Sequence, residues 1–173
     1  QAASDAEFSL ANRISRSLVA EQYPLDSRNS ILFPPEIAGK EIVIRMIASK
    51  GNNPLDGILM AHGNGTNGYS LYIYEDKLHF AVAQDEKLTI ISSKKDLPAE
   101  QFNIDATLVE DGSMTLMIDG EEIGKAKTKG LFTEELSPRR VRVGQNDSRN
   151  QVGKYQGGWM FSGRISNKST LAL

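Results

Sequence analysis

The sequence predicts an all-β fold, an antiparallel β-sandwich, from three observations. Short runs rich in β-branched and aromatic residues follow one another through the second half of the chain and end in turn signals. No long helical pattern interrupts them. The length of 173 residues fits one domain, which by surface scaling buries about 70% of its unfolded surface. Because such sandwiches host binding modules, enzymes and structural domains alike, the fold class does not define the function.

The N-terminal segment carries the one helical pattern of the chain. Ser4 followed by Glu7 forms a capping box, and apolar residues recur at helical spacing over residues 4–22. We therefore expect residues 1–28 to form a short helix or leader and residues 29–173 to form the β-sandwich.

Strand patterns begin after the proline pair at 34–35, because proline lacks a backbone donor and ends helical structure. Residues 41–48 alternate in the manner of a half-buried strand. Its expected buried face consists of Ile42, Ile44, Met46 and Ala48, or of their neighbours. The other expected strands are 57–61, 69–74, 78–83, 87–92, 104–109, 114–118, 123–127, 140–144 and 159–165. Side chains expected to point inward are Leu71, Ile73, Leu116, Ile118, Val143 and Phe161.

Two polar loops are long enough to bind a ligand. The first, residues 62–68, contains two Asn-Gly steps, which favour the positive φ angles of turns. His62 opens this loop and is the better functional candidate of the two histidines, since His79 lies within an expected strand as a partly buried structural residue. The second loop, residues 145–150, joins the last two expected strands.

Composition excludes several classes of chemistry. The chain has no cysteine, which rules out disulfides, thiolate metal sites and a cysteine nucleophile. With 20 basic and 22 acidic residues it gives no global electrostatic case for nucleic acid or an anionic membrane, and no apolar run approaches the roughly 18 residues of a membrane span. For the four arginines at 139, 140, 142 and 149 we expect a solvated strand and loop face, with phosphate or sulfate binding as the alternative.

The order of these motifs resembles a concanavalin A-like, laminin G-like jelly roll over about residues 37 to 173. The motifs are Gly57-Ile58-Leu59-Met60, Gly68-Tyr69-Ser70-Leu71-Tyr72-Ile73, Leu116-Met117-Ile118-Asp119-Gly120 and Phe161-Ser162-Gly163-Arg164-Ile165. Within that superfamily, Ala61-His62-Gly63-Asn64 and Val143-Gly144-Gln145-Asn146-Asp147 look similar to the C-terminal β-sandwich of some bacterial arylsulfatases. The resemblance implies a non-catalytic accessory or carbohydrate-recognition module of a secreted bacterial glycan-processing enzyme. Its location would be periplasmic or extracellular, and its partner a glycan or an adjacent catalytic domain.

The sequence carries no recognisable catalytic motif. Sulfatases need a Cys/Ser-x-Pro-x-Arg motif, and the run at 137–140 has the wrong spacing. Retaining glucanases of this fold resemble one another in a Glu-x-Asp-x-x-Glu strand that holds two carboxylates on one face, and no such spacing occurs here. We therefore expect no enzyme activity. The alternatives are a glycoside hydrolase of the same superfamily and a purely structural domain that packs on a catalytic domain.

Sugar recognition needs flat aromatic rings and planar polar groups. The candidate ligand-binding residues are His62, Asn64, Asn67, Asn146, Asp147, Arg149, Tyr155 and Trp159. Trp159 and Tyr155 are open between a binding and a core position, whereas we expect Tyr69 to be core. We expect no cofactor, with calcium as the alternative. Its oxygen ligands would come from Asn64, Asn67, Asn146, Asp147 and Asn150.

Overall fold

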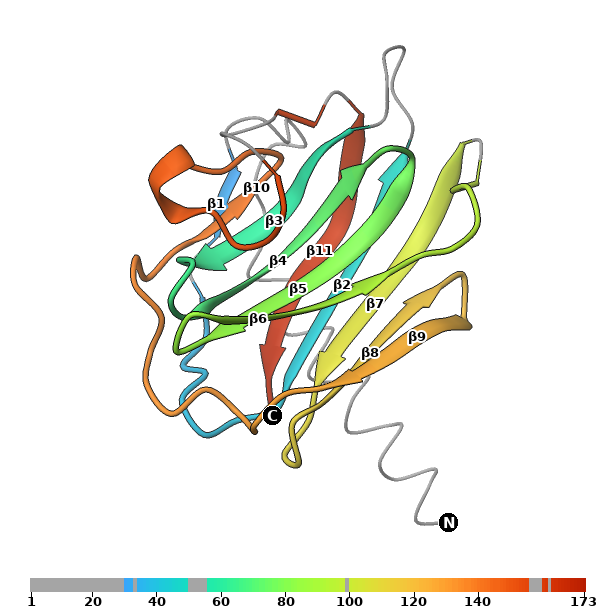
Figure 1. Cartoon of the computed structure of the whole chain (residues 1–173). Coiled ribbons are helices and arrows are strands. Elements are labelled where there is room, and N and C mark those ends of the chain that lie inside the picture. Colours follow the sequence, from blue (N-terminus) through green and yellow to red (C-terminus); the bar gives the residue numbers. More distant parts are fainter. Residues whose placement is uncertain (1–29, 33, 50–55, 99, 156–159, 162) are drawn as a thin grey trace.

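The computed structural model describes residues 30–32, 34–49, 56–98, 100–155, 160–161 and 163–173. They form two antiparallel sheets packed face to face, a jelly-roll β-sandwich as the sequence predicts (Figure 1). Sheet A runs in the order β1 (Ser30–Leu32), β10 (Val141–Val143), β3 (Gly57–Gly63), β4 (Gly68–Tyr74), β5 (Lys77–Gln84), β6 (Lys87–Ser92). Sheet B runs in the order β11 (Arg164–Ala172), β2 (Ile42–Ser49), β7 (Gln101–Leu108), β8 (Ser113–Ile118), β9 (Glu121–Lys127). The helix expected over 4–22, like the leader 1–28, lies outside the described residues.

Tight turns fix the register of the hairpins. Glu75 and Asp76 between β4 and β5 have φ angles of 51° and 60°, and Asp85 and Glu86 between β5 and β6 have 49° and 68°. Positive φ at both central positions is the geometry that matches the right-handed twist of paired strands, and aspartate tolerates it better than most residues. The β4–β5 and β5–β6 hairpins are therefore in register along their whole length.

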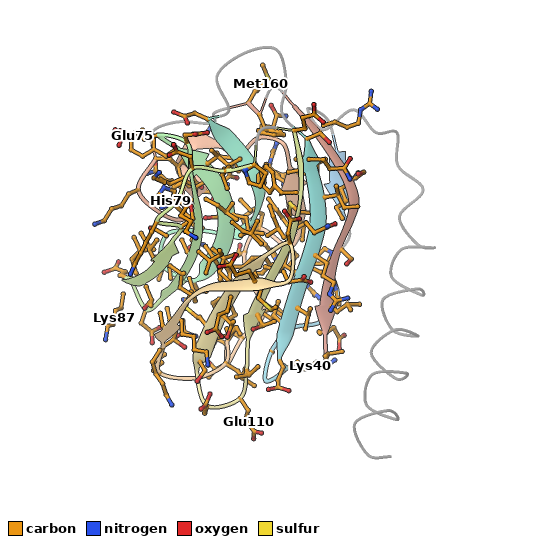
Figure 2. All side chains as sticks on the ribbon, turned by 90° about the vertical axis from the view of Figure 1, so that its right-hand side faces the viewer. Lys40, Glu75, His79, Lys87, Glu110 and Met160 are labelled. Atoms are coloured by element: carbon orange, nitrogen blue, oxygen red, sulfur yellow. The ribbon has the colours of Figure 1, made fainter. Side chains whose placement is uncertain are left out.

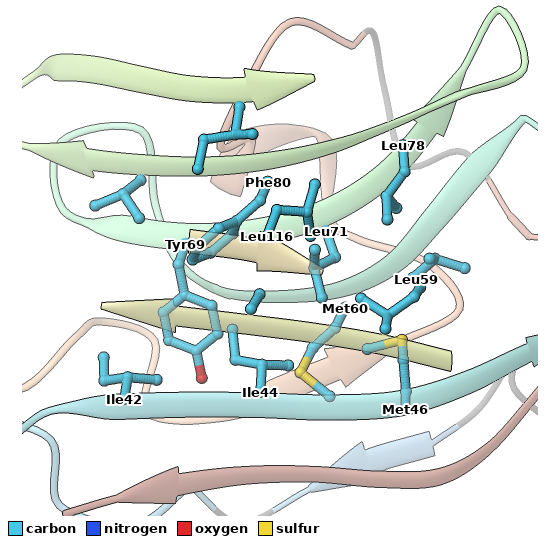
Figure 3. Packing of buried hydrophobic residues seen from close by; sticks show 14 of the residues in the cluster. Ile42, Ile44, Met46, Leu59, Met60, Tyr69, Leu71, Leu78, Phe80 and Leu116 are labelled. Atoms are coloured by element: carbon cyan, nitrogen blue, oxygen red, sulfur yellow. The ribbon is translucent and has the colours of Figure 1, made fainter. Parts of the chain in front are cut away.

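The space between the sheets is filled by the residues that alternation predicts (Figures 2 and 3). Ile42, Ile44, Met46 and Ala48 on β2 are all buried. So are Leu71, Ile73, Leu116, Ile118, Val143 and Phe161. Tyr69, expected in the core, is 1% exposed. These inward positions are confirmed, because a strand with one buried face presents every second residue to the core.

The last strand differs from its predicted range. The sequence predicts a strand over 159–165, whereas β11 begins at Arg164 and runs to Ala172. The middle of β11 is polar, but Ser169 and Thr170 are buried, and Thr170 contacts Tyr69 of sheet A. A register shift between Ser166 and Ser169 accommodates them. A bulge of this kind re-aims side chains and breaks the alternation on which the prediction rests.

The outer face of sheet A is covered by the segment 144–155, which includes the 3₁₀ turn η1 (Ser148–Asn150) and lies beside β1 and β10 (Figure 1). A second, smaller apolar cluster forms there. Its members are Ile58, Ala61, Tyr72, Ala81, Ala83, Val152 and Tyr155. Hydrogen bonds from Ser70 Oγ to the Val152 carbonyl and from Lys154 N to Tyr72 Oη, 3.1 Å, fasten the segment to β4.

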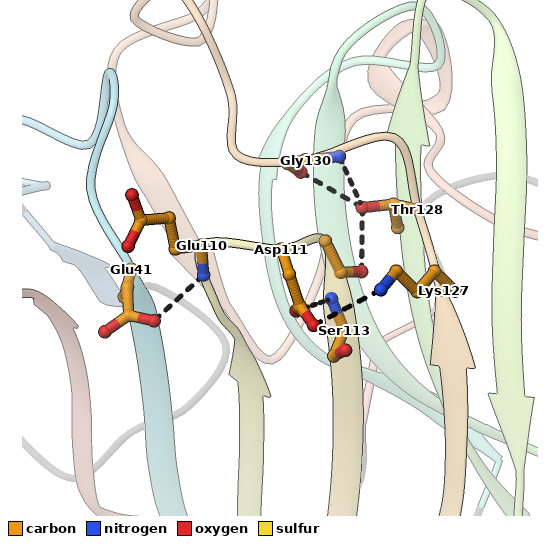
Figure 4. A network of polar contacts seen from close by, with 8 residues as sticks. Glu41, Glu110, Asp111, Ser113, Lys127, Thr128 and Gly130 are labelled. Carbon is orange, nitrogen blue, oxygen red and sulfur yellow. Dashed lines mark hydrogen bonds and ion pairs between the residues drawn. The ribbon is translucent and has the colours of Figure 1, made fainter.

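One end of the sandwich is closed by the crossover 128–140 between β9 and β10. Figure 4 shows its start: Thr128 Oγ1 donates toward the carbonyls of Gly112 and Gly130, each at 3.0 Å. Asp111 holds the adjacent β7–β8 turn, since its Oδ1 accepts from Ser113 N at 2.9 Å and its Oδ2 pairs with Lys127 Nζ at 3.2 Å. These contacts hold the first residues of the crossover against the β7–β8 turn.

Candidate functional site

A polar cavity of about 430 Å³ lies where the β3–β4 loop, the β5–β6 turn and the crossover 128–140 meet. We call it the end cavity. Its polar lining includes Asn64, Thr66, Asn67, Asp85, Glu134 and Glu135. This volume falls within the roughly 300–1,000 Å³ of small-molecule sites. The cavity thus brings together Asn64 and Asn67, two sequence-predicted site residues, from one loop.

Asn64 organises the wall of the end cavity. Its Oδ1 accepts from Thr66 N at 2.8 Å and from Asn67 N at 3.1 Å, an Asx-type turn, while its Nδ2 donates to the Ser137 carbonyl at 2.8 Å. The preceding Gly63 has φ of +85°, and a Cβ there would lie 2.4 Å from the Asn67 carbonyl oxygen, so only glycine fits. The loop is consequently rigid and attached to the crossover.

Asn67 extends this order to the β5–β6 turn. Its Oδ1 accepts from Asp85 N at 3.0 Å. Among the described residues, no acceptor faces its Nδ2, which leaves two N–H donors for a ligand. Asp85 forms an ion pair with Lys129 of the crossover, which links the β5–β6 turn to the crossover.

Glu135 is the most constrained carboxylate of the end cavity. Its Oε1 accepts from Ile37 N and its Oε2 from Ala38 N, both at 2.9 Å. The hydrogen bond from Ile37 contributes most to lowering the pKa of Glu135; partial desolvation opposes it, and Ala38 and the Arg139 charge add to the lowering. The cavity therefore holds a carboxylate that stays ionised and oriented.

His62 is not in a loop, and this part of the prediction is wrong. It is the penultimate residue of β3, pairs with Tyr69 across the ladder, and is 2% exposed. Burial lowers the pKa of His62 to about 4. The charge of Glu135 opposes this lowering, and the charge of Arg139 adds to it. The apolar run of β3 continues through the histidine because the Tyr69 hydroxyl supplies a buried partner, 3.2 Å from Nδ1. His62 therefore cannot touch a ligand directly.

Asn146 is buried as well, so its expected role as an exposed ligand-binding side chain is corrected, and Tyr155, left open between a binding and a core position, is buried. Asn146 Nδ2 donates to the Asn150 carbonyl at 2.8 Å and to Tyr155 Oη at 3.0 Å, and its Oδ1 accepts from Asp147 N at 2.9 Å. Tyr155 Oη also accepts from Val152 N at 2.9 Å. Its ring packs edge-on against Tyr72, with centroids 4.9 Å apart. These two residues hold the covering segment together.

The remaining candidates lie at the surface or outside the described residues. Asp147 caps η1 by accepting from Arg149 N at 3.0 Å, and Arg149 is exposed. Trp159 lies outside the described residues. The two expected binding loops do meet: a Cβ on Gly65 would lie 2.9 Å from the Gln151 carbonyl oxygen. Asn64 and Asn67 are thus close to the segment that carries Arg149.

The calcium alternative finds little support in this geometry. The Oδ1 atoms of Asn64, Asn67, Asn146 and Asp147 each accept a backbone N–H. Within the described part of the chain, no three acidic or histidine side chains gather in a group that could hold a metal ion. Calcium accordingly stays a prediction. Among the same residues, no helix has the length and apolar character that crossing a membrane requires.

Glu135 of the end cavity differs from the general acid of a glycosidase. A glycosidase needs one carboxyl group with a raised pKa as general acid. The pKa of Glu135 in the end cavity is displaced downward, chiefly by the hydrogen bond from Ile37 N. Such groups accept hydrogen bonds and do not donate protons near neutral pH.

Sequence reasoning misses most of the polar lining of the end cavity: it does not single out Thr66, Asp85, Glu134 or Glu135. One signal could have located Asp85: in an antiparallel meander of four strands, the first and third connections, here the β3–β4 loop and the β5–β6 turn, lie at the same end of the sheet. The sequence does not indicate that residues of the crossover 128–140 line the cavity, because the path of a connection between two sheets depends on contacts that the local pattern does not define.

No protein-family model matches this sequence, and no curated protein sequence matches it. Solved structures match in fold. Domains LG4-5 of the mouse laminin α1 chain have a TM-score of 0.67 at 15% identity, covering 84% of this chain and 40% of that one. The CBM40 module of the Ruminococcus gnavus IT-sialidase, bound to α2,3-sialyllactose, has a TM-score of 0.54 at 16% identity, covering 76% of this chain and 78% of that one. The SAP-like pentraxin of Limulus polyphemus has a TM-score of 0.52 at 16% identity, covering 87% and 80%.

These likenesses establish the laminin G-like jelly roll. At 15–16% identity they carry the fold and not the ligand. This chain spans 40% of the length of the laminin fragment. The resemblance to arylsulfatase modules stays a prediction from the sequence.

Proposed function

We propose that this chain is a non-catalytic glycan-binding module whose ligand occupies the end cavity. The observation that carries the proposal is the rigid polar wall built by Asn64. Its three side-chain hydrogen bonds fix the loop, so Asn67 Nδ2, the Thr66 hydroxyl and the cavity carboxylates can meet sugar hydroxyls with little loss of conformational entropy. Amide donors and ionised carboxylate acceptors together match the hydroxyl group, which both donates and accepts.

Two further observations support a binding function. The end cavity is an assembly of three segments far apart in the sequence, and loops positioned by a rigid scaffold commonly carry binding sites. One protein of the same fold, the Ruminococcus gnavus CBM40 module, was solved with a sialylated sugar. The wider context of the proposal is a secreted module, periplasmic or extracellular, of a bacterial glycan-processing enzyme associated with sulfatases; this context rests on the sequence resemblance.

The test is a glycan array followed by titration calorimetry with the full chain. Asn67→Asp keeps the oxygen that accepts from Asp85 N and removes both amide donors, while Glu134→Gln removes an acceptor charge at the cavity mouth. Asn67→Asp loses a neutral amide hydrogen bond and Glu134→Gln a charge-assisted one, so each should weaken binding, by about tenfold or more for Glu134→Gln. Glu122→Gln, on exposed β9 at the other end of the sandwich, is the matched control and should bind like wild type.

Three results would reject the proposal. A broad array without any bound glycan favours a structural domain. Binding that both cavity variants retain places the ligand elsewhere. Hydrolysis of a bound glycan by the pure chain, abolished by Glu134→Gln, favours the glycoside hydrolase alternative.

A further inference from the structure

Three arginines lie in or near η1, and in the described part of the chain none of them has a carboxylate partner at ion-pair distance. Arg140 directly precedes β10, Arg142 is its middle residue, and Arg149 lies in η1; we call them the arginine cluster. Among the described residues, none of the three forms an ion pair or a side-chain hydrogen bond. By contrast, Arg45 pairs with Asp105 at 2.6 Å.

The cluster differs from the solvated face expected from the sequence. The Nε atoms of Arg140 and Arg142 are buried and have no hydrogen-bond partner. Arg142 lies opposite Ala61 on the outer face of sheet A, where the covering segment removes water. A guanidinium N–H withdrawn from water without a partner costs free energy, so the folded chain holds these groups partly desolvated in advance of any ligand.

Asp147 shows that the three charges converge. The hydrogen bond from Arg149 N lowers the pKa of Asp147 most; partial desolvation opposes it, and the charges of Arg149, Arg142 and Arg140 add to the lowering. Three arginine charges therefore act on one carboxylate. Asp147 also accepts the Arg149 backbone N–H, so it positions η1 and leaves the excess positive charge uncompensated.

The arginine cluster borders the end cavity. Ser137, whose carbonyl accepts from Asn64 in the cavity wall, precedes Arg140 by three residues. On the other side, Gly65 of the β3–β4 loop lies against Gln151, two residues after Arg149. A glycan chain seated in the cavity would have the cluster beside it.

We infer that the arginine cluster binds an oxyanion carried by the ligand, a sulfate ester or a carboxylate of an acidic glycan. This inference rests on the proposed function and names the chemical class of its ligand. The planar guanidinium fork donates two parallel N–H groups to such an oxyanion, and a partly desolvated fork does so more strongly than one in water.

The experiment uses three polymers with one backbone: dextran, carboxymethyl dextran and dextran sulfate. We expect the full chain to bind at least one charged polymer more tightly than dextran at about 0.15 M salt and to lose affinity at high salt, because screening weakens exposed charge interactions. The charged polymer that binds identifies the oxyanion. Arg142→Gln and Arg149→Gln should each weaken this binding about tenfold or more. Arg149 is exposed, so its variant tests the cluster without disturbing the fold.

Lys87→Gln on exposed β6 removes the same charge away from the cluster and should change affinity less than about twofold. Equal weakening by Lys87→Gln and the arginine variants would indicate non-specific attraction and overturn the inference. So would equal binding of all three dextrans. A neutral glycan that binds through Asn67 and Glu134 and ignores the arginine variants would leave the proposed function standing and reject the oxyanion site. No binding of any glycan, neutral or charged, would reject both.

Discussion

The imidazole of His62 stands edge-on to the ring of Tyr69, with centroids 5.3 Å apart and an interplanar angle of 83°. His62 Nδ1 lies 3.2 Å from the Tyr69 hydroxyl, which in turn donates to Thr170 Oγ1 at 3.2 Å. With the Tyr69 hydroxyl donating to Thr170, its oxygen can accept a hydrogen bond from a proton on Nδ1 of His62. The chain of bonds crosses the core from sheet A to sheet B. It leaves His62 Nε2 as a buried acceptor without a partner.

This arrangement makes the stability of the domain depend on pH. Burial lowers the pKa of His62 from 6.5 to about 4 in the folded state. Between these pH values His62 is protonated in the unfolded chain and neutral in the folded chain. The free energy of unfolding therefore falls as the pH drops from 6.5 to 4. The loss attributable to His62 should reach about 3 kcal/mol across this window and stay absent above it.

Urea unfolding between pH 7 and pH 4 measures this effect when wild type is compared with His62→Gln. Glutamine donates to Tyr69 but does not titrate, so the variant should lose stability at pH 7 and close the gap to wild type as pH falls. Other groups, including His79, whose pKa burial also lowers, contribute equally to both proteins and cancel. Parallel stability curves for the two proteins would contradict the prediction.

The fold could be predicted from the sequence, and the site only in part, for a physical reason. Alternation along β2 and β8 and the Asp-Gly turn at 119–120 are local consequences of one buried face, so they appear in the sequence directly. Burial of His62 depends on Tyr69 and Thr170, the latter 108 residues away. The end cavity and the covering segment likewise depend on contacts between distant connections. Polar residues in these connections look like exposed ligand groups until their partners are known.

Asn146 is the sharpest case, and its mutation should destabilise the domain. Its amide satisfies the Asn150 carbonyl, Tyr155 Oη and Asp147 N, and the side chain is buried. Asn146→Ala should lower the free energy of unfolding by about 1–3 kcal/mol, because buried groups lose their partners. The sequence alone places Asn146 among the candidate ligand-binding residues, for which substitution would weaken binding and leave the fold intact.

Thermal and urea unfolding measure this change. Asn150→Ala is the matched control. Asn146 donates to the backbone carbonyl of residue 150, which the substitution keeps. The control should unfold close to wild type. An unchanged unfolding midpoint for Asn146→Ala would restore the exposed role and contradict the buried network.

Gly153 provides a test of how the covering segment sits on sheet A. Its φ is +122°, and an added Cβ would lie 2.6 Å from Cε1 of Tyr72 and 3.1 Å from its hydroxyl oxygen. Gly153→Ala must therefore push the segment away from β4 or strain the backbone.

Gly120→Ala is the matched control: Gly120 also has positive φ, at +79°, but an added Cβ there meets nothing within 4 Å. The control should cost about 1 kcal/mol for backbone conformation alone. Gly153→Ala should cost about 1–3 kcal/mol more, as overpacking does, and should speed hydrogen exchange at Lys154 N, which donates to Tyr72 Oη. Equal destabilisation by the two variants, with Lys154 still protected, would mean that the segment does not pack on Tyr72 as described.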